Sequence, residues 1–105
     1  MNVTIKVTNS FKHKAKPLLK KYNSLKKELY NLEEDLKSNP FQGSSLGSNL
    51  FKIRLSVESK GKGKSGGLRV ITFLETEIIS YYEKIENNIT VYLIAIYDKI
   101  KQKIF

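Results

Sequence analysis

The sequence contains no cysteine, one histidine, and 10 acidic residues against 19 basic ones. The absence of cysteine excludes a disulfide scaffold, a thiolate zinc site and a cysteine nucleophile. Because His13 is the only histidine, an enzyme that uses two histidines as acid and base is excluded, and we expect His13 on the surface of a helix. There is no apolar run of about 18 residues and no N-terminal stretch typical of a signal peptide. We therefore expect a cytoplasmic protein with no membrane partner.

The rest of the composition indicates one folded, basic domain. Hydrophobic residues make up 40% of the 105 residues and aromatic residues 10%, and there are only two prolines. This is enough apolar material for one packed core, and the chain is too short for two, so we expect a single domain over residues 1–105. The net charge of +9 predicts that the domain attracts polyanions.

The positive charge is concentrated in two segments. Residues 1–20 contain five lysines and no acid, and residues 51–70 contain six basic residues and one acid, Glu58. A solvated surface usually mixes both signs, so the second segment in particular indicates a binding surface. The lysines of the first segment are consistent with a solvated helix face.

The first 40 residues predict a strand followed by two helices. Val3, Ile5 and Val7 alternate with polar residues, which is the period of a half-buried strand. Asn9 or Ser10 is then placed to cap a helix, whose apolar positions are Phe11, Ala15, Leu18, Leu19 and Tyr22. Pro17 lies inside this helix and is expected to kink or interrupt it.

The second helix is predicted to begin after Ser24, which can cap it, and to end at Asn39-Pro40, since the residue before a proline is driven out of helical geometry. Its apolar stripe consists of Leu25, Leu29, Leu32 and Leu36. Residues 41–49 are expected to form a loop from their composition.

The second half of the chain predicts antiparallel strands. From Phe51 to Val57 apolar residues alternate with Lys52, Arg54 and other polar residues. A glycine–lysine connector over residues 59–67 follows, and Leu68 to Leu74 has the composition of another strand.

Three further expectations concern the C-terminal third. Residues 78–84 either extend the preceding strand or form their own, and residues 86–88 are expected to turn. Ile89 to Tyr97 is apolar on both faces, which is typical of a central strand covered on both sides. A strand, a helical hairpin and a twisted antiparallel sheet together make an α+β fold.

The glycine-rich segment formally matches two nucleotide-binding motifs, and neither fits its context. Residues 61–66 satisfy G-x-G-x-x-G, but the residues that follow favour a strand where that motif requires a helix. A P-loop also requires glycine at position 58, where Glu58 stands. Two interpretations remain, a flexible and soluble hairpin loop or part of a cationic site.

The flanks of this segment favour the cationic site. If the two flanking strands pair, Lys52 and Arg54 on one strand meet Arg69 on the other, with the loop lysines at the same end of the sheet. Arginine can fork onto a phosphate and lysine can act as a point charge, so this surface would suit a phosphodiester backbone.

The same residues carry a resemblance to a known family. The segments Phe51-Lys52-Ile53-Arg54-Leu55, Ser59-Lys60-Gly61-Lys62-Gly63-Lys64-Ser65-Gly66-Gly67, Arg69-Val70-Ile71 and Ile96-Tyr97-Asp98-Lys99 resemble the HigB-like branch of the RelE/ParE toxin superfamily. These are toxins of type II toxin–antitoxin operons. The resemblance implies a RelE-like α+β fold and an endoribonuclease that cuts mRNA on the translating ribosome, without a metal ion or other cofactor.

The resemblance also implies roles for individual residues. Lys52 would act as general base or positioning group, Arg54 would contact phosphate, and Arg69 would stabilise the charge of the scissile phosphate. Tyr97 would stack on a base or donate a proton. The remaining cations are expected to hold RNA: Lys60, Lys62, Lys64 and Lys99. Some relatives have a functional tyrosine in a C-terminal tail where this chain has Phe105, which leaves the general acid unassigned.

The implied partners are the ribosome, mRNA and a cognate antitoxin, expected to be of the helix-turn-helix type and to cover the basic face. Operator DNA would be bound only through the antitoxin complex. Two alternatives stay open from the sequence: an inhibitor of DNA gyrase on the same fold, and a non-catalytic RNA- or ribosome-binding module.

Overall fold

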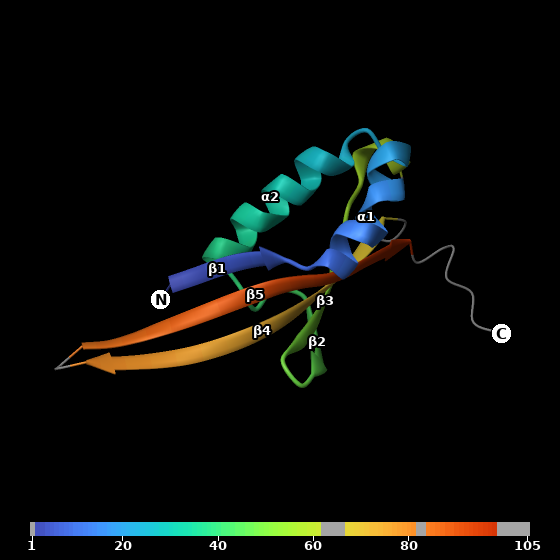
Figure 1. Ribbon diagram of the computed structural model, residues 1–105. Coiled ribbons are helices and arrows are strands. Elements are labelled where there is room, and N and C mark those ends of the chain that lie inside the picture. Colours follow the sequence, from blue (N-terminus) through green and yellow to red (C-terminus); the bar gives the residue numbers. More distant parts are fainter. Residues whose placement is uncertain (1, 62–66, 82–83, 99–105) are drawn as a thin grey trace.

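The computed structural model describes residues 2–61, 67–81 and 84–98, and it confirms the predicted α+β fold with a strand, two helices and then a sheet (Figure 1). In chain order the elements are β1 (Asn2–Val7), α1 (Asn9–Lys21), α2 (Leu25–Ser38), β2 (Ser44–Gly47), β3 (Leu50–Leu55), the short 3-10 helix η1 (Glu58–Lys60), β4 (Leu68–Tyr81) and β5 (Lys84–Asp98).

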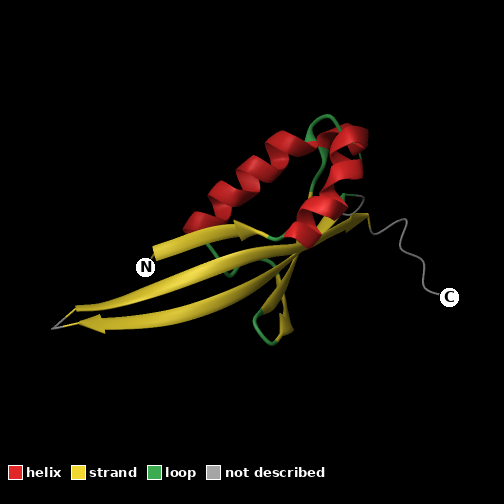
Figure 2. Ribbon diagram, in the orientation of Figure 1, coloured by secondary structure: helices red, strands yellow, loops and turns green. Residues whose placement is uncertain are grey.

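The five strands form one mixed sheet in the order β1-β5-β4-β3-β2. Strands β2 to β5 pair antiparallel with their neighbours, as predicted, but β1 pairs parallel to β5. Both helices lie on one side of this sheet, so the fold has two layers (Figure 2). None of the helices in the described ranges is long and apolar enough to cross a membrane.

The core lies between the helices and the sheet face that they cover. The leucine stripe of α2 faces it as predicted, since Leu25, Leu32 and Leu36 are buried and Leu29 is half-buried. From the sheet the core receives Ile53, Val70, Leu74, Ile89, Val91, Leu93 and Ile96. The alternation of β1 is also confirmed, because Val3, Ile5 and Val7 pack against this cluster.

The start of α1 differs from the sequence-based expectation. Thr8 is the N-cap, and its Oγ1 accepts a hydrogen bond from the Phe11 N–H at 3.1 Å. Asn9 and Ser10 already belong to the helix. The same Thr8 hydroxyl donates to the Leu93 carbonyl at 2.9 Å, which ties the helix start to β5. Of the two effects expected of Pro17, a kink or an interruption, the interruption does not occur, because α1 continues through Pro17 to Lys21.

A polar network holds η1 against the beginning of α2. Ser24 is the N-cap residue of α2, as predicted, but its side chain makes no capping bond. Its Oγ instead accepts from the Ser59 N–H at 3.0 Å and lies 2.8 Å from Ser59 Oγ. Glu28 Oε2 accepts from the Glu58 N–H at 2.7 Å. A carboxylate that accepts from a backbone N–H is a strong, charge-assisted acceptor, so η1 is fixed to the helical layer.

The segment 41–49 contains a strand that the sequence did not reveal. Residues 44–47 form β2, which pairs with β3 through a turn at Ser48 and Asn49, both with positive φ (52° and 64°). Two consecutive residues of positive φ are typical of a two-residue hairpin turn. All four residues of β2 are exposed, so the strand has no buried alternation that a sequence pattern could show.

Strands β4 and β5 form a long hairpin that extends beyond the helical layer (Figure 1). Residues 78–81 extend β4, and residues 86–88 lie within β5, so the predicted turn there is wrong. Strand β5 is central, between β1 and β4. Within the described ranges, however, helices cover only one of its faces, and Thr90, Tyr92 and Tyr97 on the other face are half-buried.

Candidate functional site

The face of the sheet that the helices leave uncovered carries three basic residues of the second positive segment, Lys52, Arg54 and Arg69. Ile53, Val70 and Ile96 are register partners across β3, β4 and β5, and all three point into the core. Successive side chains of a strand point to opposite faces. The adjacent residues therefore lie on the uncovered face.

Three of the predicted site residues form one row across that face. Arg54 on β3 is the register partner of Arg69 on β4, and Arg69 is the partner of Tyr97 on β5. Neighbouring strands are about 4.8 Å apart, so the row spans about 10 Å between its outer members. Lys52 lies two residues from Arg54 along β3, on the same face, about 7 Å away. The structure thus brings together all four residues to which a catalytic role was assigned.

The four side chains differ in exposure. Arg54 is exposed, Lys52 and Tyr97 are half-buried, and Arg69 is 2% exposed. The Arg69 Nη1 donates to the Leu68 carbonyl at 3.3 Å. Within the described part of the chain, neither Lys52 nor Arg54 has an ion-pair partner. Arg54 and Arg69 carry like charges at directly opposed positions, which disfavours the strand pair unless other charges compensate them.

Gly43 shapes the surface beside Lys52. Its φ is +99°, and a Cβ at this position would lie 2.6 Å from the Lys52 carbonyl oxygen. Only glycine therefore allows the chain to pass this close to β3. A hollow of about 240 Å³ lies here, lined by Gln42, Gly43, Ser44, Lys52, Ile53 and Arg54. Lys52 and Arg54, the two cations of β3, therefore border the same concave surface.

Lys60 does not join this group, although the sequence predicted that it would hold RNA with the other cations. Its Nζ lies 3.3 Å from Asp98 Oδ2, and the two side chains are only 10% and 6% exposed. The Tyr22 hydroxyl donates to the same oxygen at 3.2 Å. Because Asp98 follows Tyr97 in β5, it points to the helical side of the sheet. Lys60 therefore lies on the opposite face from the row.

Of the other residues that the sequence singled out, one is described by the structure and four are not. His13 is exposed on α1, as expected. Lys62, Lys64, Lys99 and Phe105 lie outside the described residues. The described ranges contain no cluster of three or more His, Asp or Glu side chains that could hold a metal ion.

Sequence reasoning missed an aromatic pair on the uncovered face. Phe73 and Tyr92 are register partners with ring centroids 6.1 Å apart, and Lys6 Nζ lies 6.0 Å from the centre of the Tyr92 ring. Planar rings beside cations are the elements of single-stranded RNA binding. The composition of β4 and β5 could not reveal the pair, since both strands are apolar at most positions and the pairing joins residues far apart in sequence.

No family model matches the chain, and neither a curated protein nor a solved structure was found to match it. The resemblance to the RelE/ParE toxins therefore rests on the sequence motifs quoted above and stays a prediction.

Proposed function

We propose that this protein is the toxin of a type II toxin–antitoxin system and acts as a ribosome-dependent mRNA endoribonuclease. The observation that supports this most directly is the row of Arg54, Arg69 and Tyr97, with Lys52 beside it, on the sheet face that the helices leave uncovered. The proposed setting is the cytoplasm, with mRNA and the ribosome as substrate and partner.

RNA supplies its own nucleophile, so such a site needs no metal in the proposed mechanism. The 2′-oxygen attacks the adjacent phosphorus and the 5′-oxygen leaves with a proton, which yields a 2′,3′-cyclic phosphate. The protein has to align these atoms and neutralise the charge that develops on the phosphate. In this mechanism Arg69 and Arg54 bind the phosphate and offset its developing charge. Lys52 positions or deprotonates the 2′-hydroxyl, and Tyr97 stacks on a base or donates the proton to the 5′-oxygen.

The antitoxin is proposed to neutralise this face. An acidic segment placed over Lys52 and Arg54 would compete with the phosphodiester backbone through charge complementarity. Contact with operator DNA would then be made by the antitoxin in the complex.

Growth arrest on induced expression tests the proposal. The double variant Lys52→Ala/Arg54→Ala should relieve arrest, since it removes two cations that border the hollow. Lys26→Ala/Lys27→Ala, which changes two exposed lysines of α2, removes the same charge elsewhere and should remain toxic. A toxic, folded Lys52→Ala/Arg54→Ala protein would contradict the site, and equal detoxification by both pairs would show that only net charge matters.

One observation favours a second candidate, a non-catalytic RNA-binding module. Arg69 is 2% exposed, and a phosphate-stabilising arginine has to reach the substrate. If the protein is such a binding module, RNA binding by Arg54 and Lys52 would depend steeply on salt concentration, as phosphate contacts do. The wild-type protein would then produce neither RNA cleavage nor growth arrest.

A further inference from the structure

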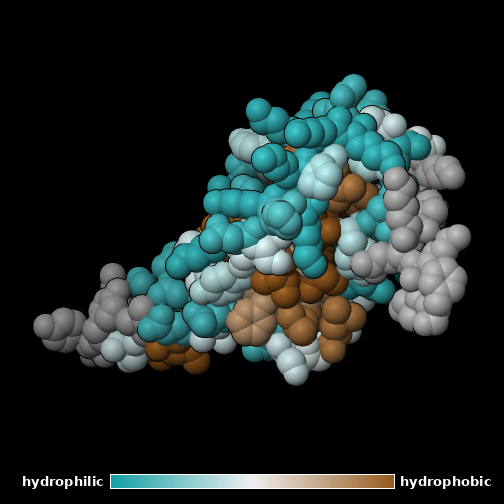
Figure 3. Space-filling model, turned by 45° about the vertical axis from the view of Figure 1, so that its right-hand side comes forward, coloured by the Kyte–Doolittle hydropathy of each residue, from teal (hydrophilic) through white to brown (hydrophobic). Residues whose placement is uncertain are grey.

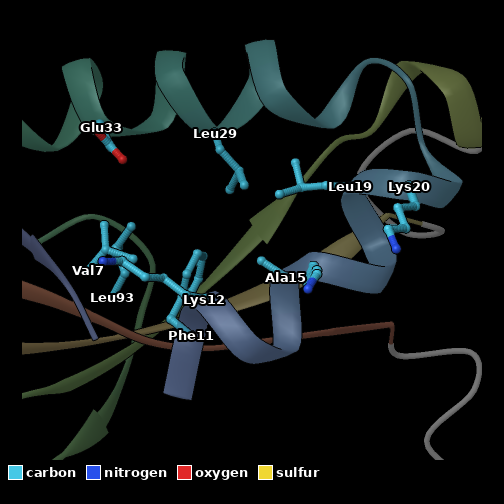
Figure 4. Close-up of a pocket in the computed structure, with 10 residues that line it drawn as sticks. Val7, Phe11, Lys12, Ala15, Leu19, Lys20, Leu29, Glu33 and Leu93 are labelled. Carbon is cyan, nitrogen blue, oxygen red and sulfur yellow. The ribbon is translucent and has the colours of Figure 1, made fainter. Parts of the chain in front are cut away.

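A second row of side chains crosses the uncovered face of the sheet, beside the row of the proposed site. Phe73 on β4 is the register partner of Tyr92 on β5, and Tyr92 is the partner of Lys6 on β1. Their neighbours in sequence, Val7 and Leu93, lie on the helical side of the sheet, where they line an apolar pocket (Figure 4). Because adjacent side chains of a strand point to opposite faces, Lys6 and Tyr92 share the uncovered face with the proposed site. Phe73, Tyr92 and Lys6 together form the aromatic row.

The two rings of the aromatic row form an apolar surface that is partly open to solvent. The ring centroids of Phe73 and Tyr92 are 6.1 Å apart, and the ring planes are inclined by 36°. Both side chains are half-buried, and both helices lie on the other side of the sheet (Figure 2). Figure 3 shows hydrophobic surface below the mainly hydrophilic helical layer, so apolar side chains are not confined to the core. The rings are therefore accessible to a planar ligand.

A cation stands beside these rings. Lys6 is exposed, and its Nζ lies 6.0 Å from the centre of the Tyr92 ring. Within the described part of the chain Lys6 has no ion-pair partner. A base that stacks on an aromatic ring is joined to a phosphate, and a lysine beside the ring is placed to neutralise that phosphate. The aromatic row thus combines the two contacts that a nucleotide requires.

Acidic residues follow the aromatic row on the side away from the proposed site. Glu75 and Glu77 continue the alternation of β4 beyond Phe73 on the uncovered face, and both are exposed. Carboxylates at this end of the face repel a phosphodiester backbone, whereas Lys52 and Arg54 attract it at the other end. An RNA strand that crosses the face from the proposed site is therefore expected to end its contact at the aromatic row.

The distance between the two rows corresponds to a few nucleotides. Arg69 and Phe73 are four residues apart on β4, on the same face, which places them about 14 Å apart. This distance equals about four nucleotides at the spacing of about 3.4 Å in a stacked strand, and fewer where the bases are unstacked. A base within about four nucleotides of the cleaved bond can thus reach the rings.

We propose that Phe73 and Tyr92 form a base-stacking subsite for single-stranded RNA, and that Lys6 binds the phosphate beside the stacked base. Aromatic side chains on neighbouring strands of an open sheet stack unpaired bases in other RNA-binding folds. The occupant is a nucleobase rather than an apolar peptide, because only the base brings a phosphate to Lys6. This inference rests on the proposed function, since it extends the path of the RNA that Lys52 and Arg54 are proposed to bind. Every base has a π-face, so the subsite holds the strand without selecting a sequence.

RNA binding by ring variants tests the subsite. The probe is a fluorescent single-stranded RNA of about ten nucleotides, long enough to span both rows, with 2′-O-methyl groups that remove the nucleophile. Phe73→Leu/Tyr92→Leu keeps apolar side chains but removes the rings. It should weaken binding by about fivefold or more and leave the slope of log affinity against log salt unchanged. Lys6→Ala should make that slope shallower by about 0.7. Tyr30→Leu, which removes a ring that is 62% exposed on α2, should change neither quantity.

Lys52→Ala/Arg54→Ala, measured in the same assay, separates the subsite from the proposed function. Loss of affinity in this variant, with wild-type affinity in the ring variant, would overturn the subsite and leave the proposed function intact. The opposite result would support the subsite and contradict the proposed function. A shallower salt slope in the ring variant would also overturn the subsite, because the loss would then be one of phosphate contacts.

Photo-cross-linking of the wild-type protein tests the subsite without any variant that has to fold. The RNA contains 5-iodouracil in place of uracil, and peptide mass spectrometry after irradiation locates the residue to which the nucleotide is attached. We expect attachment at Phe73 or Tyr92. Attachment only at other residues, such as Tyr97 or Tyr30, would overturn the subsite.

Discussion

Lys60 Nζ lies 3.3 Å from Asp98 Oδ2 in a site where both side chains are almost completely buried. The pair joins the end of η1 to the end of β5, next to Tyr97. The Tyr22 hydroxyl adds a third group from the end of α1. The segment that enters the glycine–lysine connector is therefore anchored to the helices on one side of the sheet, while Lys52 and Arg54 stand on the other.

Asp98→Ala should reduce the free energy of unfolding by about 3 kcal/mol, because removing one partner of a buried pair leaves the other charge without that compensation. Urea unfolding measures the change. Glu34→Ala is the matched control. It breaks an ion pair with Lys37 whose side chains are 46% and 56% exposed, and exposed pairs contribute less than about 1 kcal/mol. Similar losses in the two variants would show that the Lys60–Asp98 pair has no structural role.

Gly43→Ala should destabilise the protein more than Gly47→Ala. Both glycines have positive φ, +99° and +83°, so both variants are strained by about 1 kcal/mol. Only at Gly43 would the new Cβ also meet the Lys52 carbonyl, whereas nothing lies within 4 Å of a Cβ at Gly47. Overpacking of this kind adds about 1–3 kcal/mol. Equal unfolding free energies for the two variants would contradict the close approach of this loop to β3.

Thr72→Val should stabilise the protein by about 1 kcal/mol, as measured by chemical denaturation. Thr72 is fully buried, and its hydroxyl has no hydrogen-bond partner in the described part of the chain. Replacing an unsatisfied buried hydroxyl by a methyl group of similar shape removes a desolvation penalty. Thr76→Val changes an exposed threonine of the same strand and should stay within about 0.5 kcal/mol. A destabilised Thr72→Val protein would indicate that the hydroxyl is satisfied in solution.

Much of the fold could be predicted because local periodicity marks which residues face the core. The alternation of Val3, Ile5 and Val7 and the leucine stripe of α2 each identified an element and its buried side. Strand β2 has no such pattern, since all of its residues are exposed. Thr8 was missed as a cap because Asn9 and Ser10 are equally good capping residues, and only the contact with Leu93 distinguishes Thr8.

The sequence predicted the parts of the candidate site that follow from alternation along a strand and from the pairing of neighbouring strands. It did not predict side-chain contacts between residues far apart in the chain, or the burial of individual side chains. The spacing of Lys52 and Arg54 places both on one face of β3, and antiparallel pairing with β4 then adds Arg69. Tyr97 was expected from the family resemblance alone, and the pairing of β4 with β5 places it beside Arg69. Lys60 was wrongly grouped with them because it is close to them in sequence. Its ion-pair partner, Asp98, is far away in the chain, and no sequence pattern identified this contact. The burial of Arg69 likewise follows from packing that no sequence pattern records.

Arg54→Ala should weaken RNA binding without lowering the free energy of unfolding. Removing one of two directly opposed arginines relieves repulsion across the strand pair, so the unfolding free energy should stay the same or rise by less than about 1 kcal/mol. Affinity for single-stranded RNA should fall, and the slope of log affinity against log salt should become shallower by about 0.7, the value for one phosphate contact on a single strand. Lys26→Ala, at an exposed position of α2, should change neither. Unchanged RNA affinity and salt slope in Arg54→Ala would exclude Arg54 from the RNA surface.

Mapping of RNA 5′ ends after induced expression tests the central claim most directly. The account predicts new ends inside translated regions, which disappear from a reporter message without a start codon and are absent with the Lys52→Ala/Arg54→Ala protein. Growth arrest with intact RNA would contradict the proposed nuclease activity. Growth arrest accompanied by DNA breaks would indicate instead that the protein inhibits DNA gyrase.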